Sequence, residues 1–128
     1  MEILTNIHSI WRWAVLITAV GAVVLSVMAA TGSRPWDALS DRFSLFFTIA
    51  MDIQFLIGAV VWITGSRWNG ENAYLSFLHP ALMIAAIALA HVGRSRADRT
   101  KGDKVKGTQA AIFFGASLVV VLIAIPLS

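Results

Sequence analysis

Four long stretches of apolar residues, separated by short polar segments, dominate the pattern of the chain. They cover about residues 7–30, 43–64, 73–92 and 109–127, with few ionisable side chains inside them. A helix needs about 20 predominantly apolar residues to cross the hydrocarbon core of a membrane. The pattern therefore predicts an all-α protein, an integral membrane four-helix bundle whose short loops join the spans within a single domain, residues 1–128.

Composition excludes an ordinary soluble enzyme. The chain is 58% hydrophobic and 13% charged, and its mean hydropathy is +0.76, whereas a soluble domain carries roughly 25% charged residues. The chain contains no cysteine, which excludes a disulfide framework, a thiolate metal site and a cysteine nucleophile. The sequence also has no phosphate-binding loop and no nucleophile elbow, so a hydrolase is not expected.

The basic residues are unevenly distributed over the polar segments. Six of the ten lie within residues 94–106, and Arg34 and Arg42 are expected on the same side of the membrane. The other side has only Arg67 in a loop and Arg12 just inside the first span. Lys and Arg in short loops favour the cytoplasmic side. We therefore expect the basic loop 94–106 in the cytoplasm and both termini on the outward side of a bacterial inner (cytoplasmic) membrane.

This distribution also bears on the isoelectric point, which is near 10.0. Nucleic-acid binding requires a basic face, whereas here the bases gather at the predicted membrane boundaries. No nucleic-acid partner is expected. The basic loop is interpreted as a topology signal that also contacts anionic lipid.

Ionisable side chains inside the spans are the best functional candidates, because such residues are costly in lipid. His8 and Arg12 lie near the outward start of the first span. His79 is expected about two turns into the third span, roughly 10 Å below its outward end. Two imidazoles on facing helices are what a b-type haem needs, with one nitrogen each to the iron. Arg12, one helical turn after His8, would then pair with a haem propionate.

Other interpretations of these three residues stay open at this point. His8 at a helix start could be interfacial, and His79 before Pro80 could hydrogen-bond a freed carbonyl. Arg12 could extend along its helix to the membrane surface.

Asp52 and Gln54 lie near the middle of the second span and, two residues apart, point to nearly opposite sides. At least one must face the bundle interior, and Asp52 has the stronger need. Asp52 is expected either to be a neutral, hydrogen-bonded carboxyl, with Thr48 or Ser26 as a donor, or to serve as a proton site near a quinone or redox cofactor. The pair is therefore a candidate intramembrane polar site.

His91 is a weaker candidate than the other histidines. It lies 12 residues beyond His79, about 18 Å further along a helix, and has no second histidine nearby to complete another ligand pair. We expect it at the cytoplasmic boundary beside Arg94. The three histidines are also too separated in depth for a shared zinc or copper site.

Several short motifs occur in a fixed order along the chain. They are Ile-His8-Ser-Ile-Trp-Arg12-Trp13, Ile53-Gln54 followed by Gly58, His79-Pro-Ala-Leu-Met83, His91-Val-Gly93 before the basic loop, and a terminal Ala124-Ile-Pro126. Over essentially its whole length the chain resembles a family of small four-span bacterial membrane proteins often labelled cytochrome b-like. The resemblance implies an association with haem b or a respiratory chain, with His8, Arg12 and His79 at the carried-over positions. Family members tend to have a histidine where Asp52 stands here, so a role for a second-helix histidine is not carried over.

We therefore expect a small b-type cytochrome-like membrane protein, which holds one haem b near the outward face through His8 and His79 and transfers single electrons. Its expected partners are the lipid bilayer and, beyond it, a larger membrane redox complex or a quinone, and homo-oligomerisation stays open. The main alternative is a cofactor-free accessory subunit of a larger respiratory or photosynthetic complex. A third hypothesis is a small transporter or channel that uses Asp52 as a coupling site.

Overall fold

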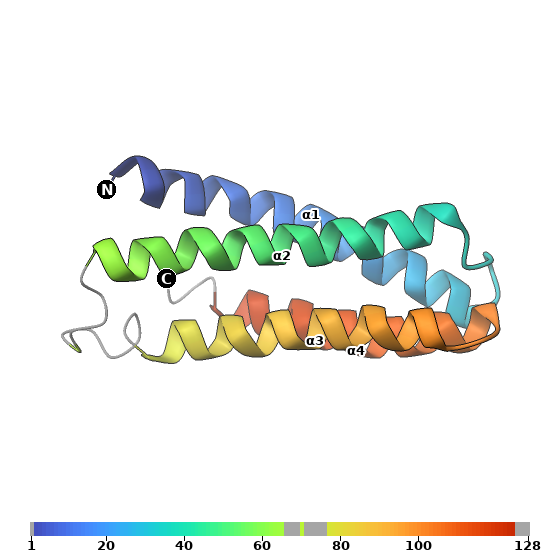
Figure 1. Cartoon of the computed structure of the whole chain (residues 1–128). Helices are drawn as coiled ribbons and strands as arrows, with labels where there is room; N and C mark the ends of the chain where they lie inside the picture. Colours follow the sequence, from blue (N-terminus) through green and yellow to red (C-terminus); the bar gives the residue numbers. More distant parts are fainter. Residues whose placement is uncertain (1, 66–69, 71–76, 125–128) are drawn as a thin grey trace.

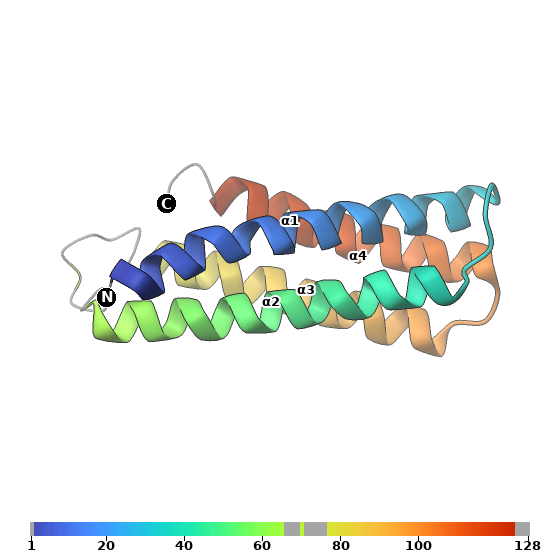
Figure 2. The ribbon, with the colours of Figure 1, turned by 90° about the horizontal axis from the view of Figure 1, so that it is seen from above.

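The computed structural model describes residues 2–65, 70 and 77–124 and folds them into four α-helices. The helices are α1 (Glu2–Thr31), α2 (Ala38–Thr64), α3 (His79–Arg99) and α4 (Asp103–Ala124). Each helix packs against two others, in the order α1, α2, α3, α4 and back to α1, and neighbouring helices run antiparallel (Figures 1 and 2). The described residues thus confirm the predicted all-α helical bundle.

Three of these helices are long and apolar enough to cross a membrane. They cover Ile3–Thr31, Ala38–Thr64 and Asp103–Ala124. The described part of α3 is not in this group, since its last turns carry Arg94, Arg96 and Arg99. The beginning of the predicted third span, from residue 73 to residue 76, lies outside the described residues, as do Arg67 and the terminal Ile-Pro motif.

The bundle is apolar on its outside and filled with small residues inside. Large apolar side chains such as Ile17, Leu56 and Ile112 are exposed, whereas the centre consists largely of alanine and includes buried serines. Soluble helices show the reverse arrangement, with a polar outer face. Small residues at helix interfaces let the backbones approach closely, which is how helices associate in lipid.

The closest approach of this kind joins α1 and α4 at Gly107. A Cβ atom added to Gly107 would lie 2.6 Å from the carbonyl oxygen of Ser26 and 2.7 Å from the Cβ of Ala29, and would also meet the backbone nitrogen of Ala30. Only glycine allows the two backbones to lie this close together.

The basic segment 94–106 is mostly helical, so the prediction of a loop over this range is wrong. Helix α3 continues to Arg99 and α4 begins at Asp103, which leaves only residues 100–102 between them. Gly102 forms the turn with a φ of +94°, a conformation that glycine adopts without strain. Hydropathy indicates where a helix would leave the lipid, but polar residues can continue the helix. Glycine and proline are the residues that commonly end one.

Helix α2 also extends beyond its predicted apolar span, since it begins at Ala38, five residues before the span does. Asp37 caps this helix, since its side chain accepts a hydrogen bond from the backbone N–H of Ser40 at 3.1 Å. Arg34 also donates to Asp37, at 2.8 Å. The hydrogen bonds from Arg34 and Ser40 lower the pKa of Asp37 below its usual value.

Candidate functional site

His8 and His79 lie together at the end of the bundle where α1 and α3 begin. Their ring centroids are 6.3 Å apart and their ring planes are nearly perpendicular, at 85°. The two histidines therefore approach one another across α1 and α3, as the sequence leads us to expect.

The α-helical part of α3 begins at His79, with Leu78 as its N-cap and Pro80 in the first turn. Phe77 and Leu78 before it form a π-helical turn, and residues 73–76 of the predicted span lie outside the described residues, so the predicted depth of His79 stays a prediction. Proline favours the first turn of a helix because it lacks the N–H that would be unpaired there. Pro80 therefore accounts for the start of α3 at this position.

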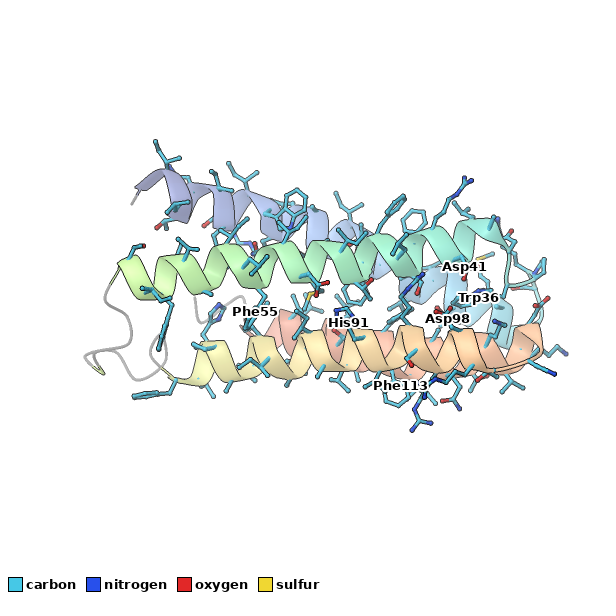
Figure 3. The ribbon with its side chains drawn as sticks, viewed as in Figure 1. Trp36, Asp41, Phe55, His91, Asp98 and Phe113 are labelled. Atoms are coloured by element: carbon cyan, nitrogen blue, oxygen red, sulfur yellow. The ribbon has the colours of Figure 1, made fainter. Side chains whose placement is uncertain are left out.

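A cavity of about 320 Å³ adjoins the two histidines. His8 and His79 both line it, together with apolar side chains that include Phe55 and Trp62 of α2 and Met83 of α3. Figure 3 shows Phe55 extending from α2 toward α3. A largely apolar cavity with a few convergent polar groups is typical of a small-molecule or cofactor site.

Two residues of α2 set the position of His8. The side-chain Nε2 of Gln54 donates to the backbone carbonyl of His8 at 2.9 Å. A Cβ atom on Gly58 would lie 3.1 Å from Cε1 of His8, so the absence of a side chain at Gly58 leaves room for the imidazole. One turn further along α1, Trp11 donates to the carbonyl of Ala50 at 2.9 Å. These contacts hold the start of α1 against α2.

Gln54 rather than Asp52 occupies the bundle interior. Gln54 is only 6% exposed, whereas the side chain of Asp52 is 45% exposed and its Oδ1 lies 2.7 Å from Nε2 of His91. Asp52 therefore does not meet the expectation of an inward-facing carboxylate. Ser26 and Thr48 do not serve as its donors, since their hydroxyls bond to the backbone carbonyls of their own helices.

His91 forms a contact that the sequence does not predict, whereas its predicted place at the cytoplasmic boundary stays a prediction. It projects from α3 toward α2 (Figure 3) and reaches Asp52, which lies near the middle of α2. The sequence shows both residues but not the register in which α2 and α3 pack, and that register brings them together.

Arg12 is half-buried one turn beyond His8. Its guanidinium carbon lies 5.9 Å from the ring centroid of Trp13, within the range of a cation–π contact. Its Nε is buried and has no hydrogen-bond partner among the described residues. Arg12 does not line the cavity, so the structure places it near His8 without bringing it to the cavity wall.

Gln54 and Gly58 are the residues whose positioning role sequence reasoning missed. The family-like motif contains both, and Gln54 is a polar side chain inside an apolar stretch, which is the signal that marked it as a candidate. Its hydrogen bond to the backbone of α1 depends on helix packing, and no local pattern contains that information.

Among residues 2–65, 70 and 77–124, no three or more His, Asp or Glu side chains are grouped so that they could hold a metal ion. Comparison of the chain with protein-family models, with characterised proteins and with solved structures finds no match. The resemblance to the cytochrome b-like family thus stays a prediction, and the case for function depends on the geometry of the site.

Proposed function

We propose that this chain is a small b-type cytochrome-like membrane protein in which His8 and His79 ligate one haem b and which transfers single electrons. The observation that carries the proposal is the spacing of the two imidazoles. A bond between a metal ion and an imidazole nitrogen is about 2 Å long, so two imidazoles that would hold one ion must have rings only a few ångströms from it and close to each other. The 6.3 Å between His8 and His79 fits this arrangement.

The surroundings of the histidines also fit the cofactor. When bound, the haem would supply one-electron oxidation and reduction of its iron. Phe55, Trp62 and Met83 give the cavity the apolar walls that a porphyrin requires and limit the access of water. Gln54 and Gly58 position His8 through the hydrogen bond and the open space described above.

Arg12 supports the same assignment. A buried N–H donor without an acceptor is costly, and the Nε of Arg12 has none among the described residues. A propionate is the anionic acceptor that a haem would bring to this region, and a guanidinium binds a carboxylate strongly. Arg12 would thereby orient the edge of the haem.

The proposal includes insertion of all four helices in the bacterial inner membrane, with the basic end in the cytoplasm and the His8–His79 end outward. Three helices of sufficient length and hydropathy support insertion, and so do the exposed apolar side chains on the outer faces. Most of the basic residues lie near the connection from α1 to α2 or near the connection from α3 to α4. Figure 1 shows these two connections at the same end of the bundle. This gathering supports the cytoplasmic assignment of that end. A quinone or a larger membrane redox complex would then be the electron partner.

The deciding experiment is a visible spectrum of the protein, purified in mild detergent from haem-replete bacterial cells. We expect an α-band in the reduced-minus-oxidised difference spectrum, which His8→Ala and His79→Ala each abolish and the matched variant His91→Ala retains. Circular dichroism confirms that each variant keeps its helix content. A colourless wild-type protein would refute haem binding, and stoichiometric co-purification with a larger membrane complex would then favour the accessory subunit.

A further inference from the structure

A second hollow, of about 630 Å³, lies toward the basic end of the bundle. Polar side chains of α3 and one of α4 provide most of its lining, among them His91, Ser95, Arg96, Arg99 and Gln109. It lies apart from the cavity beside His8 and His79, and the two share no lining residue.

The structure divides the bases of this end into two groups. Some are engaged within the bundle: Arg94 donates to the carbonyl of Asp41 and to the hydroxyl of Ser44, both at 3.3 Å, and Lys106 donates to the carbonyl of Ala97 at 2.9 Å. Arg96 and Arg99 instead line the hollow. These two guanidiniums therefore distinguish the hollow from a general excess of positive charge.

The chemistry of the hollow suits a phosphate group. The residues that line it include Arg96, Arg99, Ser95 and Gln109, whose side chains carry hydrogen-bond donors, and no acidic residue is among the described residues that line it. Guanidinium groups bind phosphate through paired hydrogen bonds. The guanidinium of Arg96 also lies 5.2 Å from the ring centroid of Phe113 on α4, labelled in Figure 3, and this cation–π contact favours one orientation of the donor.

Apolar surface adjoins the polar donors. Val92 lines the hollow and is itself exposed, and Ile112 is exposed on α4, one turn beyond Gln109. A ligand that combines a phosphate with long apolar chains can therefore contact the arginines and the outer faces of α3 and α4 together. A free phosphate ion would contact the arginines alone.

We propose that this hollow binds the headgroup of an anionic phospholipid, with Arg96 and Arg99 on the phosphate and the acyl chains beside Val92 and Ile112. Basic pockets between helices at the cytoplasmic side of a membrane are suited to such headgroups. The proposal rests on the membrane insertion proposed above and is independent of haem binding.

Lipid binding is measured by native mass spectrometry of the detergent-solubilised protein titrated with phosphatidylglycerol or with phosphatidylcholine. We expect tighter binding of phosphatidylglycerol. The double variant R96Q/R99Q removes both guanidiniums, and the matched control K101Q/K104Q removes the same charge from two exposed neighbours outside the hollow. We expect R96Q/R99Q to weaken phosphatidylglycerol binding about tenfold more than the control does.

Several outcomes would overturn the proposal. Equal losses in the two double variants would mean that only general positive charge attracts the lipid, and an absent preference for phosphatidylglycerol would exclude the site. Displacement of the lipid by millimolar inorganic phosphate would indicate a site for soluble anions instead. The variant R96K/R99K keeps the charge but loses the paired guanidinium hydrogen bonds, so its binding of phosphatidylglycerol should lie between that of the wild type and that of R96Q/R99Q. Circular dichroism of each variant separates loss of the site from loss of the fold. These readouts do not depend on a visible spectrum, so a colourless protein leaves this test intact.

Discussion

The Nε2 atom of His91 on α3 lies 2.7 Å from Oδ1 of Asp52 on α2, and this contact bridges two helices across 39 residues of sequence. The side chains of His91 and Asp52 are 52% and 45% exposed, so the pair lies at the outer edge of the seam between α2 and α3 rather than in the core. Of the four neighbouring helix pairs, α2 and α3 have the least extensive packing. This contact thus joins the helices where apolar packing joins them least.

The first prediction concerns the energy of this pair. We expect Asp52→Ala and His91→Ala each to lower the free energy of unfolding in detergent by about 0.5–1.5 kcal/mol, because each removes one partner of this hydrogen bond. The double variant should lose little more than either single variant, since both remove the same interaction. Thermal unfolding followed by circular dichroism measures all three. Strictly additive losses would show that the two side chains act independently.

A second prediction tests the space that Gly58 leaves for His8. A methyl group on Gly58 would press on the imidazole at 3.1 Å, so Gly58→Ala should lower the haem α-band per mole of protein. Gly115→Ala is the matched control, because a Cβ there meets nothing within 4 Å, and it should keep the full band. The same substitution at Gly115 should stabilise α4 by about 0.5–1 kcal/mol, since alanine is the better helix former. An equal loss of the band in both variants would contradict the positioning role of Gly58.

A third prediction concerns the contact between α1 and α4. The backbone of α1 surrounds the place of a Cβ on Gly107, with the carbonyl oxygen of Ser26 at 2.6 Å, and backbone atoms cannot yield as a flexible side chain can. We expect Gly107→Ala to destabilise the protein by about 1–3 kcal/mol, the usual cost of overpacking. Thermal unfolding beside the Gly115→Ala control measures the difference. A neutral effect at Gly107 would mean that α1 and α4 lie further apart than the structure has them.

The fourth prediction tests the orientation in the membrane. The chain has no cysteine, so a single introduced thiol is a unique label. In intact bacterial spheroplasts, a membrane-impermeant maleimide should react with N6C, near the start of α1, and should react with K101C, between α3 and α4, only after lysis. Labelling of K101C alone in intact spheroplasts would show that the protein has the opposite orientation in the membrane. Labelling of both in intact spheroplasts would contradict a cytoplasmic location of the basic end.

Helix number and the chemistry-bearing residues could be predicted from the chain because each depends on local composition. Four apolar stretches indicate four helices, and the described residues contain four. The ends of the helices could not be predicted in the same way. The apolar stretch stops near Val92, but α3 continues to Arg99 because the intervening residues include no proline and Gly93 is buried against Phe113 and Phe114.

In the candidate site, too, the identity of the residues could be predicted from the sequence, whereas the contacts between helices could not. Its histidines stand out because an ionisable side chain in an apolar stretch needs a partner or a function. The prediction that Asp52 rather than Gln54 faces inward is wrong, because the cost of burying each group does not by itself decide which side chain finds a partner inside the bundle. His91 offers Asp52 a partner at the outer seam, whereas Gln54 finds a backbone carbonyl of α1 inside the bundle.

By itself, then, the sequence determined an all-helical chain with four long apolar segments, most of its bases in the polar segments after the first and the third of them, and histidines within or beside the apolar segments. These properties follow from hydrophobicity and charge, which belong to each segment alone. Only the tertiary structure decided that His8 lies 6.3 Å from His79, that His91 pairs with Asp52, and that Arg96 and Arg99 line one hollow. Each of these contacts joins separate helices or depends on the rotation of a helix about its axis. The packing of small residues such as Gly107 across the bundle sets both which helices lie together and how each is rotated.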